Sequence, residues 1–153
     1  MTSRQTADPP KILLIDDNAG DIRLITEALR AAVAGVEVRS VSDSTQAIPY
    51  LRAALEAEDS PNLVLLDLRM PKRSGLEVLE EIRKDPRMAY LPVVVLTSSE
   101  ADQDVFRAYS LRASAVVTKP LDYLGLRSAM KILCEFWLGV ARLPPAMPIG
   151  RKQ

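Results

Sequence analysis

Residues 63–71 read LVLLDLRMP, a run of four apolar residues that ends in an aspartate, Asp67. Such a short and nearly continuous apolar run is typical of a strand that is covered on both faces of a parallel sheet. Three further runs have the same character, and a fifth alternates between apolar and polar residues, as an edge strand with one wet face does. The five predicted strands are Ile12–Ile15, Val36–Val41, Leu63–Leu66, Val93–Leu96 and Ala115–Val117.

Helical patterns fill the segments that follow these strands. Pro49 conflicts with a regular first turn of the second helix, so we expect it to delay or kink that helix. Ser74 and Glu77 have the spacing of a capping box at the start of the third helix. Four helices are predicted at about 22–33, 48–55, 101–111 and 121–140, and the third helix is expected to follow Ser74 and to include Leu79 and Ile82. Strands that alternate with helices predict an α/β fold, here a doubly wound (βα)5 parallel sheet with helices on both faces.

Composition limits the possible classes of protein. The chain has 153 residues, with 48% hydrophobic and 26% charged residues and a formal net charge of zero. One domain at residues 11–140 is therefore expected, between a flexible segment 1–10 and a Pro-rich tail 141–153. Without a basic stripe or patch we expect no nucleic-acid partner. The apolar runs are too short to span a membrane and the start lacks the order of a secretory signal, so we expect a cytoplasmic protein without a membrane partner.

Histidine is absent from the chain, and cysteine occurs once, as Cys134. The lack of histidine excludes imidazole catalysis, histidine metal ligands and phosphohistidine chemistry within this chain. A single cysteine excludes an internal disulfide, and its apolar helical setting favours a packed thiol over a reactive one.

Polar residues follow four of the predicted strands. They are Asp16 and Asp17 after the first strand, Asp67 after the third, Thr97 and Ser98 after the fourth, and Lys119 after the last. Each of them alone has a structural explanation, as a turn residue, a helix cap or a strand end. Ligands of an open parallel sheet bind beyond the carboxyl ends of its strands, so these side chains are expected to meet.

Three carboxylates held about 4 Å apart repel one another by on the order of 1–4 kcal/mol per pair. A bound Mg²⁺ removes that repulsion, because it prefers a few carboxylates together with waters and phosphate oxygens. A carboxylate beside such an ion can attack phosphorus and form an aspartyl phosphate, while the ion and a lysine neutralise charge on the transferred group. The residues therefore predict phosphoryl transfer to an aspartate with Mg²⁺ as cofactor.

With this set of residues, the sequence resembles the receiver domains of two-component response regulators over about 11–140. The matching positions are Asp16–Asp17, Asp67 in LLDLRMP with Gly75 after it, Thr97 in VVVLTSS, and Lys119–Pro120. The resemblance implies a flavodoxin-like sheet with the strand order 2-1-3-4-5. The chemotaxis response regulator, a member of the same family, has this order.

The resemblance also implies a role for each residue. Asp67 would accept the phosphoryl group, and Asp17 would bind Mg²⁺ directly with Asp16 acting largely through water. The backbone carbonyl of Arg69 would complete the protein ligands of the metal, and Lys119 would contact the phosphoryl group. Thr97 would be the switch hydroxyl, and the small side chain of Ser98 would leave room for the phosphate. The Lys119–Pro120 bond is expected to be cis.

One position departs from the family pattern. Many receivers have Tyr or Phe three residues before the lysine, as a rotamer switch, whereas this chain has Val116. The switch is therefore expected to act through backbone shifts after Thr97. The strings DDNAGDIRLITEAL and KPLDYLGLRSAMKILCEFWL resemble the stand-alone regulators that partner bacterial phytochromes. This narrower resemblance implies a light-regulated sensor histidine kinase, a bacteriophytochrome, as the phosphoryl donor.

Two other functions compete with a signalling switch. A phosphohydrolase of the haloacid-dehalogenase class needs a second aspartate two residues after its nucleophile, and Arg69 stands there instead. A degenerate receiver that only binds a partner would not need the whole set of phosphorylation residues, which is intact here: Asp16, Asp17, Asp67, Thr97 and Lys119. We therefore expect a switch, not a turnover enzyme, with output through protein–protein contacts or phosphate relay to an unknown downstream protein.

The last predicted helix has more apolar surface than one contact with a sheet requires. Its apolar positions span on the order of 200°, against about 100° for a helix packed on one side. We expect the excess to form a homodimer, although the tail 141–153 could cover it instead. The residues expected in the dimer interface are Leu126, Met130, Leu133, Phe136 and Trp137.

Overall fold

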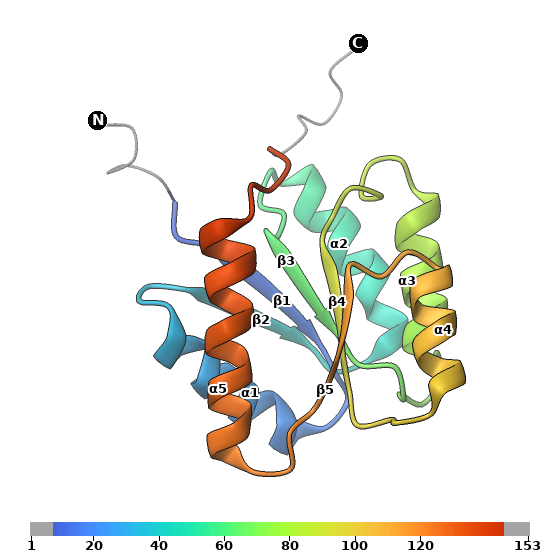
Figure 1. The fold of residues 1–153 in the computed structure, drawn as a ribbon. Helices are drawn as coiled ribbons and strands as arrows, with labels where there is room; N and C mark the ends of the chain where they lie inside the picture. Colours follow the sequence, from blue (N-terminus) through green and yellow to red (C-terminus); the bar gives the residue numbers. More distant parts are fainter. Residues whose placement is uncertain (1–7, 146–153) are drawn as a thin grey trace.

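A computed structural model describes residues 8–145, so most of segment 1–10 and of tail 141–153 lies outside the described residues. Within these described residues, five strands and five α-helices alternate (Figure 1). The strands are β1 Lys11–Ile15, β2 Glu37–Val41, β3 Leu63–Leu66, β4 Val93–Thr97 and β5 Ala115–Thr118. The helices are α1 Ala19–Ala32, α2 Ala47–Glu56, α3 Gly75–Lys84, α4 Asp102–Ser110 and α5 Tyr123–Glu135, with 3₁₀ turn η2 Ser44–Gln46 and π-helical turn η3 Phe136–Val140.

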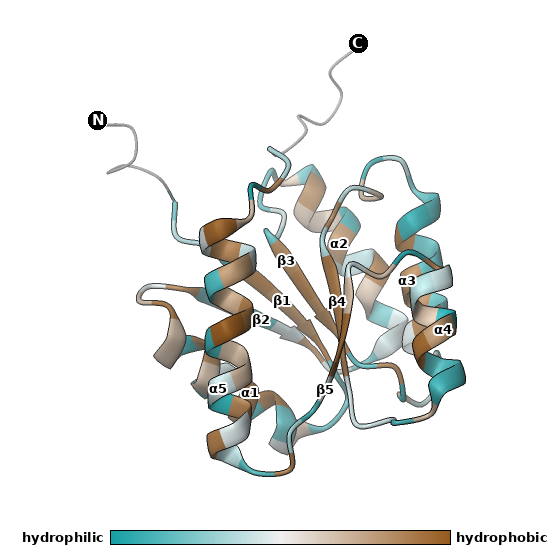
Figure 2. Ribbon diagram, viewed as in Figure 1, coloured by the Kyte–Doolittle hydropathy of each residue, from teal (hydrophilic) through white to brown (hydrophobic). Residues whose placement is uncertain are grey.

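All neighbouring strands are parallel, and their order is β2-β1-β3-β4-β5. This confirms the predicted doubly wound sheet. Helices α1 and α5 cover one face, and α2, α3 and α4 cover the other (Figure 1). Successive residues of β3 alternate between the two cores, with Leu63 and Leu65 facing α1 and α5 and Val64 and Leu66 facing the other helices. In Figure 2 the central strands are accordingly hydrophobic (brown) along their length.

The two edge strands are less buried than the three central ones. β2 lies at one edge, as its sequence predicted, and of its five residues only Val41 is fully buried. β5 packs against both cores, but its residues Ala115, Val116 and Val117 are only partly buried because the strand lies at the edge of the sheet. The continuous apolar run therefore identified β5 as a strand but overstated how deeply the strand is buried.

The expected effect of Pro49 was wrong, and the last helix begins two residues later than predicted. α2 begins at Ala47, two residues before Pro49, so the proline lies in the first turn and does not delay the helix. Backbone N–H groups of the first turn have no partner within the helix, and a proline there therefore loses no hydrogen bond. α5 begins at Tyr123 because the side chain of Asp122 caps it, and beyond Glu135 the helix widens into the π-helical turn.

Cys134 lies in the core between α5 and the sheet, with 3% of its surface exposed. Burial raises the pKa of its thiol to about 11. A packed thiol was predicted and is confirmed. None of the helices within residues 8–145 has the length and apolar character that a membrane span requires.

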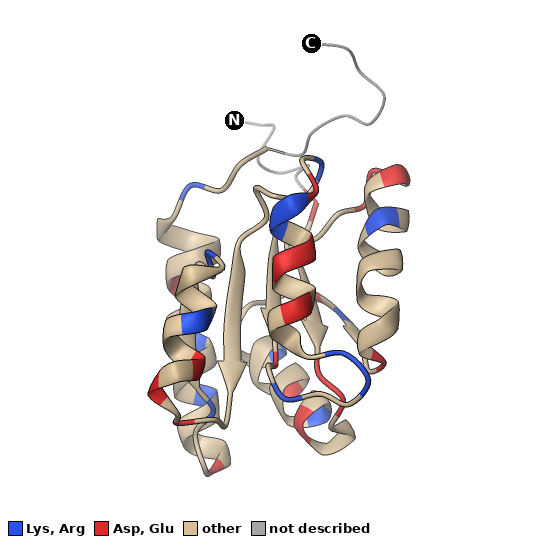
Figure 3. Cartoon of the chain, turned by 90° about the vertical axis from the view of Figure 1, so that its right-hand side faces the viewer, with Lys and Arg blue, Asp and Glu red and all other residues tan. Residues whose placement is uncertain are grey.

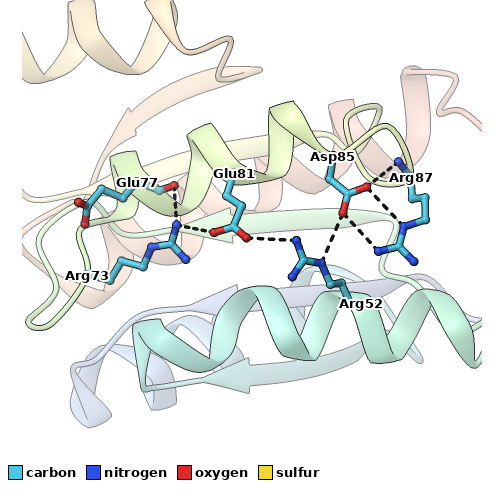
Figure 4. Close-up of polar contacts among 6 residues, drawn as sticks. All are labelled: Arg52, Arg73, Glu77, Glu81, Asp85 and Arg87. Carbon is cyan, nitrogen blue, oxygen red and sulfur yellow. Dashed lines mark hydrogen bonds and ion pairs between the residues drawn. The ribbon is translucent and has the colours of Figure 1, made fainter.

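Charged side chains join α2 to α3 on the surface (Figure 4). Arg52 of α2 donates to Glu81 at 3.2 Å and to Asp85 at 3.4 Å. Glu81 also accepts from Arg73, which precedes α3, and Asp85 accepts from Arg87. Two acidic residues, one within α3 and one at its C-terminal cap, thus each bind two arginines. These ion pairs form a charge ladder that extends along the length of α3.

Candidate functional site

The predicted polar residues meet at the end of the sheet to which the strand arrows point. Loops with both acidic and basic residues gather at that end (Figure 3). Asp16 follows β1, Asp67 follows β3, Thr97 ends β4 and Lys119 follows β5, so four separate segments contribute to one site. Three of these side chains are buried, with 1% of Asp16, 6% of Asp67 and 1% of Thr97 exposed.

Asp16, Asp17 and Asp67 form a cluster of carboxylates. One oxygen from each of the three lies within 4.8 Å of the others. Asp17 is exposed beside its two buried neighbours, so the cluster opens to solvent on one side. Hard oxygen ligands with an open side fit Mg²⁺, which keeps several of its waters.

Lys119 is the cation of the site. Its Nζ lies 2.8 Å from Asp16 Oδ2, 2.8 Å from Asp21 Oδ2 and 3.8 Å from Asp67 Oδ1. Burial lowers the pKa of Lys119, but hydrogen bonds to Asp16 and Asp21 and the attraction of Asp67 outweigh it and leave the pKa raised. The lysine therefore stays charged and is aimed at the carboxylates.

Asp67 is harder to ionise than an ordinary aspartate. Burial raises its pKa from 3.8 to about 6, and the charge of Asp16 adds to the rise, while Lys119 opposes it. The carboxylate is therefore short of compensating positive charge. A divalent cation between Asp16, Asp17 and Asp67 would supply that charge.

The chain returns closely on itself after Asp67. The backbone N–H of Gly75 donates to the carbonyl of Leu68 at 2.9 Å. A Cβ on Gly75 would lie 2.1 Å from the backbone oxygen of Asp67, which no real side chain tolerates. Gly75 is thus needed because the start of α3 packs directly on the backbone of Asp67. The predicted capping box of Ser74 and Glu77 is present and fixes this helix start.

Thr97 and Val116 lie on neighbouring strands, β4 and β5. Thr97 Oγ1 accepts from the backbone N–H of Ser99 at 3.1 Å, and Ser98 is exposed. Val116 is partly buried against the core on the α4 side. Its backbone N–H donates to the hydroxyl of Tyr109 on α4 at 3.1 Å, so a tyrosine contacts the position from which the aromatic residue is missing.

Sequence reasoning missed three residues around the site. Asp21 binds Lys119 from the first turn of α1, and Asp104 of α4 accepts from Arg69 and from Ser99, each at 2.6 Å. No sequence signal distinguishes Asp21 or Asp104 from an ordinary acidic residue in a first helical turn. Ser44 is the third, and it binds the loop after Asp67 instead of the carboxylates themselves.

The structure corrects the expected dimer interface. Leu126, Met130 and Leu133 are 7%, 0% and 6% exposed and pack in the core of their own chain. Trp137 is half-buried against the same core and contacts Phe136 edge to face at 5.1 Å. Of the expected residues only Phe136, at 49% exposed, faces largely outward. The residues that face the sheet fill the core, and the remaining apolar surface lies on an exposed stripe formed by Ile132, Phe136 and Val140.

A family model described as the response regulator receiver domain matches residues 12–131. The chain belongs to this receiver family. Response regulator Rcp1 of Synechocystis is 38% identical over 143 residues, which cover 92% of this chain and 97% of the relative. The probable methanogenesis regulatory protein FilR2 of Methanothrix harundinacea is also 38% identical, over 92% of this chain and 91% of its own.

Solved receiver structures superimpose on nearly the whole chain. The phosphorylated cyanobacterial phytochrome response regulator RcpA is 42% identical, with a TM-score of 0.83 over 90% of this chain and 99% of its own. A Mn²⁺-bound form of Rcp1 is 37% identical, with a TM-score of 0.80 over 90% of this chain and all of the other. The receiver is thus a signalling switch by family, which leaves no support for the phosphohydrolase alternative.

Proposed function

We propose that this receiver accepts a phosphoryl group on Asp67 from the phosphohistidine of a sensor kinase. The observation that carries the proposal is the placement of a buried Asp67 between an acidic pair and the lysine Lys119. An Asp67 carboxylate oxygen attacks phosphorus, the phosphorus–nitrogen bond of the donor breaks, and the imidazole leaves with that electron pair.

The surrounding side chains have distinct tasks in this reaction. Lys119 offers positive charge to the oxygens of the transferred group. Thr97 donates its hydroxyl to the phosphoryl group once that group is on Asp67, and the small Ser98 leaves room for it. Asp16, Asp17, Asp67 and the Arg69 carbonyl would hold Mg²⁺, which supplies charge neutralisation when bound. The new charge on Asp67 then shifts a pre-existing equilibrium between two surfaces of the domain.

Asp67→Asn tests the acceptor directly. With a small phosphodonor and Mg²⁺, the wild-type chain should take up one base-labile phosphate, measured by intact mass, and Asp67→Asn none. Asp59→Asn is the control, because Asp59 binds Lys11 at the start of β1, the opposite end from the site. Full uptake by Asp67→Asn would refute the assignment.

Asp17→Asn should weaken Mg²⁺ binding far more than Asp59→Asn does.

The donor is proposed to be a histidine kinase linked to a phytochrome, as the similarity to RcpA suggests. Exposed leucines flank the lysine: Leu24 of α1 is 39% exposed and Leu121 is fully exposed, and both line a hollow with Asp21 and Lys119. This apolar rim suits a helical partner that brings its phosphohistidine to Asp67. We place the reaction in the cytoplasm, where such kinases present their phosphohistidine.

A homodimer through the last helix remains part of the proposal, on a revised set of residues. Ile132, Phe136 and Val140 are 65%, 49% and 79% exposed. Large apolar side chains grouped on one exposed stripe mark interaction surfaces. A second copy of the chain could bury this stripe about a two-fold axis.

A further inference from the structure

Ser44 is one of four polar or charged residues that are buried among residues 8–145. The other three are Asp16, Asp67 and Thr97, and all of them belong to the phosphorylation site. Ser44 lies in the segment between β2 and α2, is 2% exposed and has no role in the transfer reaction itself. A buried hydroxyl is retained at a cost unless its hydrogen bonds are made, so its partners indicate what it does.

Both hydrogen bonds of Ser44 go to the loop that follows Asp67. Its hydroxyl donates to the backbone oxygen of Pro71 at 2.8 Å and accepts from the backbone N–H of Arg73 at 3.1 Å. Next to it, Asp43 accepts from the ammonium group of Lys72 at 3.1 Å. One short segment therefore holds three successive residues of this loop.

The residues so held form a strained turn. The N–H of Arg73 also donates to the carbonyl of Pro71 at 2.7 Å, which closes a three-residue turn around Lys72. Lys72 has a φ of 69°, a conformation that residues with a side chain rarely adopt. Three-residue turns of this hand are rare and strained, and such strain persists only where surrounding contacts hold it. The Ser44 hydroxyl bonds the carbonyl and the N–H that close the turn.

The turn lies two residues beyond Arg69, whose carbonyl is the proposed metal ligand. At the far end of the loop, Gly75 packs on the backbone of Asp67. The loop is thus fastened at its end by Gly75 and in its middle by Ser44. We infer that Ser44 is a positioning residue for phosphoryl transfer: its hydroxyl holds the Pro71–Arg73 turn and, through it, the Arg69 carbonyl toward the metal. This inference rests on the proposed function of Asp67.

Equilibrium Mg²⁺ binding to the unphosphorylated protein tests the inference without relying on activity. Ser44→Ala should raise the Mg²⁺ dissociation constant, followed by amide resonances in solution, by about tenfold, as expected for two ordinary hydrogen bonds. Ser42→Ala is the matched control, since Ser42 is an exposed serine of the same segment, and it should bind Mg²⁺ as the wild type does. Wild-type affinity in Ser44→Ala would overturn the inference.

A second substitution separates positioning from general stability. Glycine adopts positive φ without steric penalty, so Lys72→Gly in the Ser44→Ala background should restore most of the lost Mg²⁺ affinity. Failure to restore it would show that the loss does not act through the turn, and would overturn the inference. If Ser44→Ala does not fold, Lys72→Val strains the same turn from an exposed position with Ser44 intact. It should weaken Mg²⁺ binding similarly, and unchanged binding would again overturn the inference.

The wild-type chain distinguishes this inference from the proposed function. If wild-type protein takes no phosphate on Asp67 with a small phosphodonor, the proposed function itself fails. If it does, and Ser44→Ala binds Mg²⁺ as tightly as the wild type, only the role of Ser44 fails.

Discussion

Asp67 combines burial with a neighbouring negative charge, and its pKa of about 6 has a consequence for stability. An unfolded aspartate titrates near 3.8, so between those two values the folded protein holds more protons than the unfolded chain. The free energy of unfolding therefore falls as pH rises through that window and stays low above it. The negative charge needed for phosphoryl transfer is thus present at neutral pH at the expense of stability.

Asp67→Asn is accordingly expected to stabilise the metal-free protein. At about 1.4 kcal/mol per pKa unit, the gain near pH 7.5 should be about 1–3 kcal/mol and should vanish near pH 4. Urea unfolding of both proteins at the two pH values measures it. Saturating Mg²⁺ should narrow the difference by stabilising the wild type more, and an equal gain at both pH values would contradict the pKa shift.

Gly75 is another residue of the site whose substitution has a predictable effect, because its position leaves no room for a Cβ atom. Gly75→Ala places a Cβ against the backbone of Asp67 and should lower the free energy of unfolding by about 1–3 kcal/mol. The protein that still folds should also take up less phosphate, because the backbone of Asp67 is displaced. Gly139→Ala is the control, because a Cβ there would meet no atom of the described residues within 4 Å. Similar stability of the two variants would show that α3 can retreat from the site.

The residues of the site were predictable to the extent that strand order brings strand ends together. Asp16, Asp67, Thr97 and Lys119 each follow or end a strand, and a parallel sheet aligns those ends. Asp21 and Ser44 were not predictable, because their roles depend on distances between a helix or loop and another segment. Such distances are set by packing in three dimensions and leave no trace in local spacing.

At the scale of elements, the ladder between α2 and α3 offers a matched comparison. Glu81 binds two arginines, Arg52 and Arg73, whereas within residues 8–145 its neighbour Glu80 binds the exposed Lys84 alone, at 3.2 Å. Charge networks stabilise more than isolated exposed pairs, which contribute little. Glu81→Gln should thus lower the free energy of unfolding by about 1 kcal/mol, and Glu80→Gln by only about 0.3 kcal/mol.

Urea unfolding at low and high salt measures both changes. High salt should shrink the difference between the two variants, because it screens charges that are partly exposed. A difference that persists at high salt would mean that Glu81 acts through packing instead of charge.

The elements themselves followed from the sequence because strands and helices have distinct apolar periods. The predictions failed where the local sequence does not determine which part of a helix a residue occupies. Pro49 is tolerated in a first turn but not in a helix interior, and the boundary of α2 decides which applies. The change from α5 to a π-helical turn at Phe136 is invisible in apolar spacing, because it adds one residue to a turn without altering composition.

For the whole molecule, the exposed apolar stripe of Ile132, Phe136 and Val140, on α5 and on η3 that continues it, predicts self-association. Phe136→Asp should convert a dimer to a monomer at micromolar concentration in sedimentation experiments, because burying a charge in an apolar contact is unfavourable. Leu124→Asp is the control, since Leu124 is 77% exposed on α5 but lines a hollow beside α1, away from the stripe. Both variants should still take up phosphate on Asp67. A wild-type monomer, with and without phosphate, would refute the dimer.

The buried thiol of Cys134 makes the molecule convenient for site-directed labelling. Maleimide and nitroxide reagents attack the thiolate, and a thiol with a pKa of about 11 inside the core offers almost none at neutral pH. Cysteines introduced at exposed positions, such as Glu27 on α1 and Gln103 on α4, can therefore be labelled selectively while Cys134 is kept in place. Paired spin labels at those two positions could follow the movement of α4 relative to α1 as phosphate is added, in an otherwise unaltered chain.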